Sequence, residues 1–147
     1  MKRSTKKPSV LLAKKHYKQE LRASCVAAAA RMLLDYHDIA NVPEAELRRI
    51  LKTKPDGTNV LNLLFLKDEK RWGLEVEIAR ANPDELFAAI RLHRIPVIAF
   101  VDTTPLPHWN ESTAHVVLVV GYNEEPVIIN DPFFEKRRNQ DSSRTIL

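Results

Sequence analysis

The segment Cys25–Tyr36 constrains the fold more than any other part of this chain. It reads CVAAAARMLLDY, with apolar residues at nearly every position around a helix of 3.6 residues per turn. A helix that is apolar on all sides is stable only in the middle of a domain. The sequence therefore predicts a buried helix that begins at Cys25, with Ser24 as its N-cap. The 147 residues of the chain are enough for one domain to enclose it.

The remaining pattern places helices in the first half of the chain and strands in the second. Asn82-Pro83 followed by Glu85 is the clearest helix start, because it combines a cap, a proline at the first position and a capping box. We expect an α+β domain in which helices pack on a C-terminal antiparallel sheet. A short helix is expected to begin at Pro43. Another helix, capped by Thr58, is expected to end near Gly73. Strands are expected at 74–79, 96–101, 115–120 and 127–129, with a turn at 123–125.

The net charge of +4 is unevenly distributed. Residues 1–22 hold eight Lys or Arg against Glu20 alone, so this segment carries +7 and the other 125 residues carry −3. We interpret residues 1–16 as a basic, solvated N-terminal arm and residues 17–147 as one domain. A tether to nucleic acid or to an anionic membrane is the alternative. No nucleic-acid recognition motif accompanies the charge, so we expect no nucleic-acid partner.

Several classes of function are excluded by composition. The three glycines, Gly57, Gly73 and Gly121, are too scattered to form a phosphate-binding loop or a dinucleotide fingerprint. A single cysteine allows neither an internal disulfide nor a zinc site built from several cysteines. We expect no cofactor and no metal. No apolar run is long enough to cross a bilayer or to form a signal peptide, so we expect a cytoplasmic protein.

The one cysteine stands where a thiolate is stabilised. Cys25 is the first residue of the predicted buried helix. Unpaired backbone N–H groups and the helix dipole favour negative charge at that point, and the thiolate is the nucleophilic form of cysteine. Taken alone, Cys25 fits a small buried apolar residue at least as well. The choice between the two interpretations depends on its partners.

His115 and Asp131 are the predicted partners. Of the five histidines, only His115 stands at the start of a buried strand, where its ring would be held rigidly. A three-residue turn at 123–125 would place position 117 opposite 131. His115 would then lie diagonal to Asp131 on one face of the hairpin, about 7–8 Å away along the backbone. A turn one residue longer or shorter would put them on opposite faces.

Gln19 is the fourth candidate. It lies six residues before Cys25, so its amide could fold back beside the sulfur. With the backbone N–H of Cys25 it would form an oxyanion hole, which usually contributes most to the rate of acyl transfer. An exposed polar loop residue is the alternative interpretation.

In this order, the residues resemble those of the bacteriocin-processing cysteine peptidases, papain-like enzymes that trim double-glycine leader peptides, and of their stand-alone relatives. The resemblance covers residues 17–133. It rests on five motifs: Gln19 with Cys25-Val26-Ala27-Ala28-Ala29; Gly57-Thr58, Leu63 and Gly73-Leu74; Pro96-Val97-Ile98-Ala99; His115-Val116-Val117; and Asn130-Asp131-Pro132.

The resemblance implies a papain-like fold and a cysteine peptidase. Cys25 would be the nucleophile, His115 its base, Asp131 the group that orients His115, and Gln19 the oxyanion donor. The family usually has glycine after the cysteine, and Val26 here would crowd the substrate.

Substrate contacts are also expected from His108 and Trp109, in a long loop that would form one wall of the cleft. The expected partners are a peptide or protein substrate and a membrane transporter or another chain, since the sequence has no transmembrane segment. Two alternatives to hydrolysis stay open: a degenerate module that binds peptides without cutting them, and an acyl or peptidyl transferase on the same fold.

Overall fold

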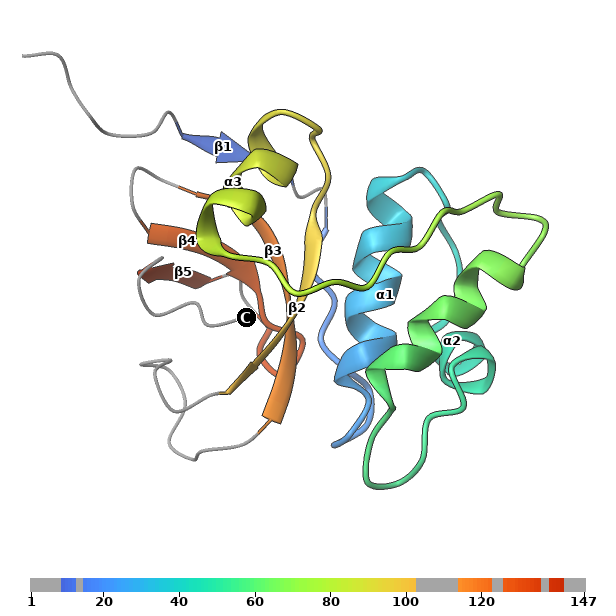
Figure 1. Cartoon of the computed structure of the whole chain (residues 1–147). Helices are drawn as coiled ribbons and strands as arrows, with labels where there is room; N and C mark the ends of the chain where they lie inside the picture. Colours follow the sequence, from blue (N-terminus) through green and yellow to red (C-terminus); the bar gives the residue numbers. More distant parts are fainter. Residues whose placement is uncertain (1–8, 13–14, 103–113, 123–125, 136–137, 142–147) are drawn as a thin grey trace, which may run out of the picture.

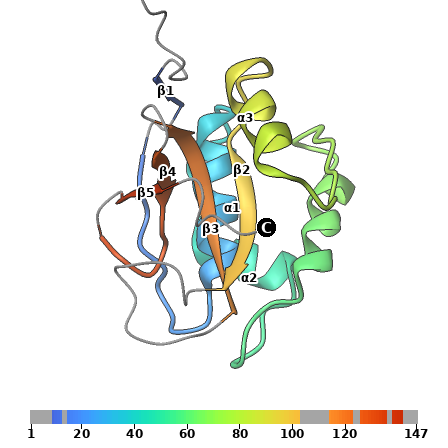
Figure 2. The same ribbon diagram turned by 60° about the vertical axis from the view of Figure 1, so that its left-hand side comes forward.

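The computed structural model describes residues 9–12, 15–102, 114–122, 126–135 and 138–141. Helices flank an antiparallel sheet, with α1 and α2 on one face and α3 on the other (Figures 1 and 2). The predicted α+β class is confirmed. The elements are β1 (Val10–Leu11), α1 (Cys25–Tyr36), α2 (Glu44–Ile50), the 3-10 helix η1 (Val60–Asp68), α3 (Pro83–Arg91), β2 (Val97–Asp102), β3 (Ala114–Tyr122), β4 (Pro126–Asn130) and β5 (Arg138–Asp141).

Strand β3 is the centre of the sheet. It pairs with β2 along one edge and with β4 along the other, and β5 extends the sheet beyond β4. The short β1 pairs with Gly121 and Tyr122 at the end of β3, beyond the residues of β3 that pair with β2. β1 and the buried Leu12 thus belong to the folded domain, although they fall within residues 1–16, the segment predicted to be a separate arm.

The alternation of side chains along β3 divides the core into two layers. Val117 and Val119 pack with Leu86, Phe87 and Ile90 of α3. Val116 joins the α1–α2 side, and Leu118 and Val120 pack with Met32 of α1. Because helices cover both faces, nearly every residue of β3 is buried and its sequence is a continuous apolar run.

Helix α1 has the predicted bounds, and its alanines are almost fully buried. The predicted cap is wrong. The Ser24 side chain makes no capping bond to the helix. Its hydroxyl instead bonds to the backbone of Leu21 and lies 3.2 Å from the Glu44 carboxylate. The hydroxyl oxygen accepts a bond from the Leu21 N–H, which takes the place of the free helix N–H groups.

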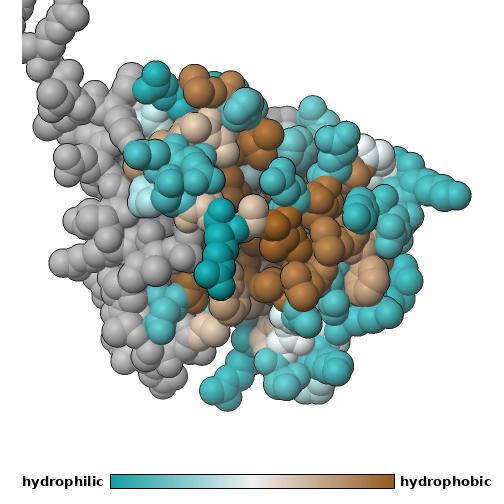
Figure 3. All heavy atoms as spheres, viewed as in Figure 1, coloured by the Kyte–Doolittle hydropathy of each residue, from teal (hydrophilic) through white to brown (hydrophobic). Residues whose placement is uncertain are grey.

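Two further predictions on the middle of the chain are wrong. The helix expected from Thr58 to Gly73 is the shorter 3-10 helix η1, capped by Asn59, whose side chain accepts a bond from the Leu61 N–H. The strand expected at 74–79 is absent from the sheet. Its alternation has another cause: Leu74 and Val76 are half-buried against the α1–α2 core while the residues between them face solvent. Apolar side chains gather on this side of the molecule (Figure 3).

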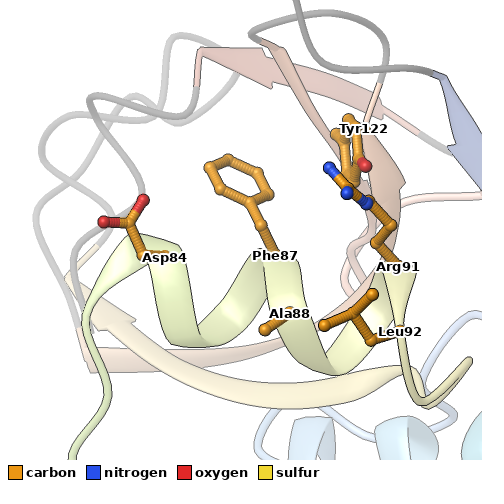
Figure 4. Close-up of a pocket in the computed structure, with 6 residues that line it drawn as sticks. All are labelled: Asp84, Phe87, Ala88, Arg91, Leu92 and Tyr122. Carbon is orange, nitrogen blue, oxygen red and sulfur yellow. The ribbon is translucent and has the colours of Figure 1, made fainter.

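Helix α3 confirms the capping prediction, since the Asn82 side chain accepts a bond of 2.9 Å from the Glu85 N–H. Beside it lies a pocket of about 210 Å³ (Figure 4). Four residues of α3, its C-cap Leu92 and the buried Tyr122 line it: Asp84, Phe87, Ala88, Arg91, Leu92 and Tyr122. The pocket lies on the α3 side of the sheet, and none of the predicted site residues that the structure describes lines it.

Gly121 is required because the backbone of β1 lies very close to this position of its partner strand β3. A Cβ atom at this position would lie 2.0 Å from the carbonyl oxygen of Val10. We therefore predict that Gly121→Ala lowers the free energy of unfolding by about 2 kcal/mol or more, because backbone must move to admit the methyl group. Urea denaturation measures the change. An unchanged midpoint would show that β1 does not pack against β3 in solution.

Candidate active site

Cys25 opens helix α1, as predicted. It is a free cysteine, half-buried against the α1–α2 core. No acidic side chain stands in the first turn of α1, so nothing there opposes the attraction of the helix N-terminus for a thiolate. The sulfur is thus held by a buried helix and retains access to solvent.

His115 is the second residue of β3 and is held beside β2. It pairs with Val101 of β2, and its side chain is 5% exposed. Its Nε2–H donates to Oδ1 of Asp131 over 2.6 Å. The Cys25 side chain is close enough to the ring to raise the pKa of His115. Since Nε2 is occupied by Asp131, Nδ1 is the ring nitrogen left for the thiol.

Asp131 is fully buried directly after β4. The predicted hairpin placed position 117 opposite 131, and the observed pair Leu118–Asn130 is the adjacent step of that register. The carboxylate is fixed further by the N–H of Phe133, which donates to the same Oδ1 over 3.0 Å. The structure therefore brings His115 and Asp131 together as the hairpin argument required.

The β3–β4 register near the turn differs from the predicted register. Near the turn, Tyr122 pairs with Val127, whereas a three-residue turn would pair it with Pro126. A bulge between Val119 and Gly121 then shifts the register by one residue. The two departures cancel before the site. A β-bulge inserts one unpaired residue and so restores the face that the altered pairing at the turn would have lost.

The surroundings of His115 favour its charged form. Burial opposes the charge and is the largest influence, but it is outweighed by the hydrogen bonds to Asp131 and Cys25 and by the attraction of both groups. Together they raise the pKa of His115 to about 9. At neutral pH the ring is then an imidazolium, which donates to the carboxylate through Nε2 and has Nδ1 left for the sulfur.

Gln19 lies in the segment that leads to Cys25 and is 8% exposed. Its amide nitrogen donates to the carbonyl oxygens of Leu21, over 2.8 Å, and Arg22, over 2.7 Å. Its Oε1 is buried without a hydrogen-bond partner. Rotating the amide would set Oε1 against two carbonyl oxygens, so the observed orientation is the favourable one. Both hydrogens of the predicted oxyanion donor are thus engaged within its own loop in this state.

The backbone of Gln19 ties that loop to the other half of the site. Its N–H donates to the carbonyl of Pro132 over 2.6 Å, directly after Asp131. Among the described residues, no cluster of His, Cys, Asp or Glu could hold a metal ion. No helix among them is long and apolar enough to cross a membrane. What the arrangement offers chemically is a thiol, a charged imidazole and a buried carboxylate in line.

Comparison with known sequences agrees with this chemistry. The model of the peptidase C39 family matches residues 13–144, nearly the whole chain. The chain belongs to the peptidase C39 family. The predicted resemblance and the prediction of a cysteine peptidase are both confirmed by this match.

Two relatives support the assignment to the C39 peptidases. The Pediocin PA-1 transport/processing ATP-binding protein PedD of Pediococcus acidilactici is 38% identical over 109 residues, which are 74% of this chain and 13% of that protein. A crystal structure of a C39-like peptidase from Bacillus anthracis superposes with a TM-score of 0.68 at 16% identity, covering 95% of this chain and 92% of the other. The second likeness establishes the fold.

The remaining predicted site residues of this C39 peptidase are placed differently from expectation or lie outside the described residues. Val26 is 2% exposed and packs in the α1–α2 core. The turn of α1 directs its side chain into this core. His108 and Trp109, predicted to contact substrate, lie outside the described residues.

Sequence reasoning missed Glu44, a carboxylate that is 1% exposed and bonded to the segment between Gln19 and Cys25. Its place at the start of a predicted helix marked it as an ordinary surface residue of a first turn. Nothing in the local pattern indicated that a distant loop would bury it.

The raised pKa of His115 predicts how stability changes with pH. A pKa of about 9 in the folded state, against 6.5 in the unfolded state, means that the contribution is fully present below pH 6.5 and is lost as the pH rises through 9. The loss is on the order of 3 kcal/mol, since one pKa unit corresponds to about 1.4 kcal/mol. In Asp131→Asn, which lacks the carboxylate, the decline over this window should be much smaller. Urea unfolding at pH 6.5, 7.5 and 9 compares the two proteins, and equal slopes would contradict the assignment.

Proposed function

We propose that this chain hydrolyses peptide bonds, with Cys25 as nucleophile, His115 as general base and acid, Asp131 as the residue that orients His115, and Gln19 as an oxyanion donor. The observation that carries the proposal is the buried 2.6 Å bond from His115 to Asp131, with the other ring nitrogen left for a half-exposed thiol at a helix start.

The steps follow from these positions. The Cys25 thiolate attacks the scissile carbonyl carbon, and the carbonyl oxygen takes the negative charge. The His115 imidazolium gives its proton to the leaving amine as the C–N bond breaks, which leaves a thioester. Neutral His115 then takes a proton from water, whose oxygen attacks the thioester and releases the acid and the thiolate. Asp131 stays ionised throughout and stabilises the imidazolium.

The oxyanion needs hydrogen-bond donors beside the sulfur. The backbone N–H of Cys25 belongs to the first turn of α1, where N–H groups have no partner within the helix. Gln19 contributes its amide by exchanging one of the carbonyl oxygens of Leu21 and Arg22 for the oxyanion. This exchange is favourable because the developing charge is a stronger acceptor than a neutral carbonyl oxygen.

The substrate that we propose is a leader peptide, cut after a pair of glycines, and the partner is a transporter that carries the released product. The name of the Pediococcus relative, a transport and processing protein, supports a processing reaction and a transporter partner, and the resemblance to the bacteriocin-processing peptidases supports the double-glycine leader. Peptide binding without cleavage is less well supported, because Val26 leaves the thiol accessible.

The function is tested by cleavage of peptide libraries, read by mass spectrometry. We expect the native protein to cut a subset of peptides, and Cys25→Ala and His115→Ala to cut none, because each removes a reacting group. Asp131→Asn should retain a small residual rate, since that residue orients the base and does not itself react. His37→Ala is the matched control, as His37 follows the far end of α1.

Alkylation of Cys25 provides an independent check of the nucleophile. The thiol should react faster than free cysteine at neutral pH and slow down in acid. Reaction only after denaturation would assign Cys25 to the core and overturn the proposal. Products that carry an added amine in place of water would instead identify a transferase.

The role of Gln19 is tested by Gln19→Ala. The bond to the oxyanion strengthens only as the tetrahedral intermediate forms, so kcat should fall on the order of 100-fold with little change in KM. The rate of alkylation by a simple alkyl halide should change little, because that reaction forms no oxyanion. Because Gln19 also bonds Leu21 and Arg22, a parallel loss of alkylation would assign it to the folding of the loop. Unchanged kcat would remove it from the mechanism.

A further inference from the structure

The loop from Gln19 to Ser24 connects two of the proposed catalytic residues, the oxyanion donor and the nucleophile. Gln19 stands at its start, and Cys25 follows its end directly. It belongs to neither a helix nor a strand. A loop of this kind needs side chains from elsewhere in the fold to fix its shape, because it has few backbone bonds of its own.

Glu44 supplies such a side chain from the first turn of α2. Its carboxylate oxygen Oε1 accepts a bond of 2.9 Å from the backbone N–H of Glu20, and the hydroxyl of Ser24 lies 3.2 Å from the same oxygen. Glu20 follows Gln19, and Ser24 precedes Cys25. A single carboxylate oxygen therefore bonds next to both proposed catalytic residues of this segment.

The other oxygen of the carboxylate is held by Arg48, one turn further along α2. Arg48 also bonds the side chain of Glu20 over 3.3 Å. The guanidinium of Arg48 thus bonds both the carboxylate of Glu44 and the side chain of Glu20 in the loop. The Ser24 hydroxyl completes the network within the loop by accepting a bond of 3.0 Å from the N–H of Leu21.

The burial of this carboxylate indicates a specific role. Glu44 is 1% exposed, whereas Glu46 in the same turn is partly exposed and pairs with Arg71 at the surface. Removing a carboxylate from water is costly unless its bonds are complete, and an apolar residue would fill the same space without that cost. Here the carboxylate of Glu44 bonds the loop and Arg48, the residue that also bonds the loop.

We propose that Glu44 is a positioning residue for the cysteine peptidase reaction: its carboxylate fixes the loop from Gln19 to Ser24 on helix α2 and so sets Cys25 against His115. The inference rests on the proposed function. Acyl transfer depends steeply on geometry, and a shift of about 1 Å in a reacting group can cost about 100-fold in rate. Loosening the loop should therefore reduce turnover without weakening substrate binding.

The test compares Glu44→Gln with Glu46→Gln. Both remove one negative charge from the same turn of α2, but only the first places an amide N–H against Arg48 or the loop. We expect Glu44→Gln to lower kcat 10- to 100-fold with KM within about 2-fold of wild type. The rate of Cys25 alkylation by iodoacetamide at neutral pH should also fall several-fold. Glu46→Gln should match the wild type in all three quantities.

Ser24→Ala is the second variant, since it removes the contact of Ser24 with Glu44 and leaves the bond from the Glu20 N–H and the pair of Glu44 with Arg48 intact. It should reproduce the loss of kcat, and the double variant should be no worse than the poorer single variant, because both break one interaction. If Glu44→Gln does not fold, Ser24→Ala decides the question alone.

Two results would overturn the proposal. In the first, Glu44→Gln and Ser24→Ala are less stable to urea but keep wild-type kcat and alkylation rates well below their unfolding temperatures. In the second, Glu46→Gln loses as much activity as Glu44→Gln. The alkylation rate needs no peptide substrate, so it decides the role of Glu44 even if the native chain cuts no peptide, a result that would count against the proposed function alone.

Discussion

The buried bond between His115 and Asp131 is the interaction on which the rest of the site depends. Both groups are buried, so each is tolerated because the other is present. The bond sets the orientation of the ring, directs the remaining nitrogen to Cys25 and keeps the imidazole charged at neutral pH. In turn it requires β3 and β4 to stay in one register, because a slip of one residue would move His115 to the other face of the hairpin.

The sheet and the segment before α1 are joined at this point by backbone and side-chain bonds. The Gln19 N–H bonds the carbonyl of Pro132, and the His16 ring donates to the carbonyl of Phe134 over 2.6 Å. On its other side the same segment is held by Glu44. The segment that leads to Cys25 is thus held on one side by the turn that follows β4 and on the other by helix α2. A nucleophile and a base from opposite ends of a chain need such a connection, because each element alone fixes only its own half of the geometry.

Pattern and capping indicated much of the fold. The apolar circumference of Cys25–Tyr36 required a central helix, and the continuous apolar run of β3 required cover on both faces. The predictions failed where a pattern has more than one physical cause. Residues 74–79 alternate because one side packs on the α1–α2 core, without a strand partner, and Ser24 gave its hydroxyl to a loop and a buried carboxylate rather than to the helix.

The sequence by itself determined which residues were available for the chemistry: a single cysteine at a helix start, one histidine at the mouth of a buried strand and an aspartate at the end of the next. Side-chain chemistry and local periodicity are properties of short segments, so they can be read from the chain. Only the tertiary structure decided how these residues meet. The bulge that restores the hairpin register, the inward turn of Val26 and the burial of Glu44 all arise from contacts between segments distant in sequence. No local pattern records such contacts, because their energy depends on what the rest of the fold places beside them.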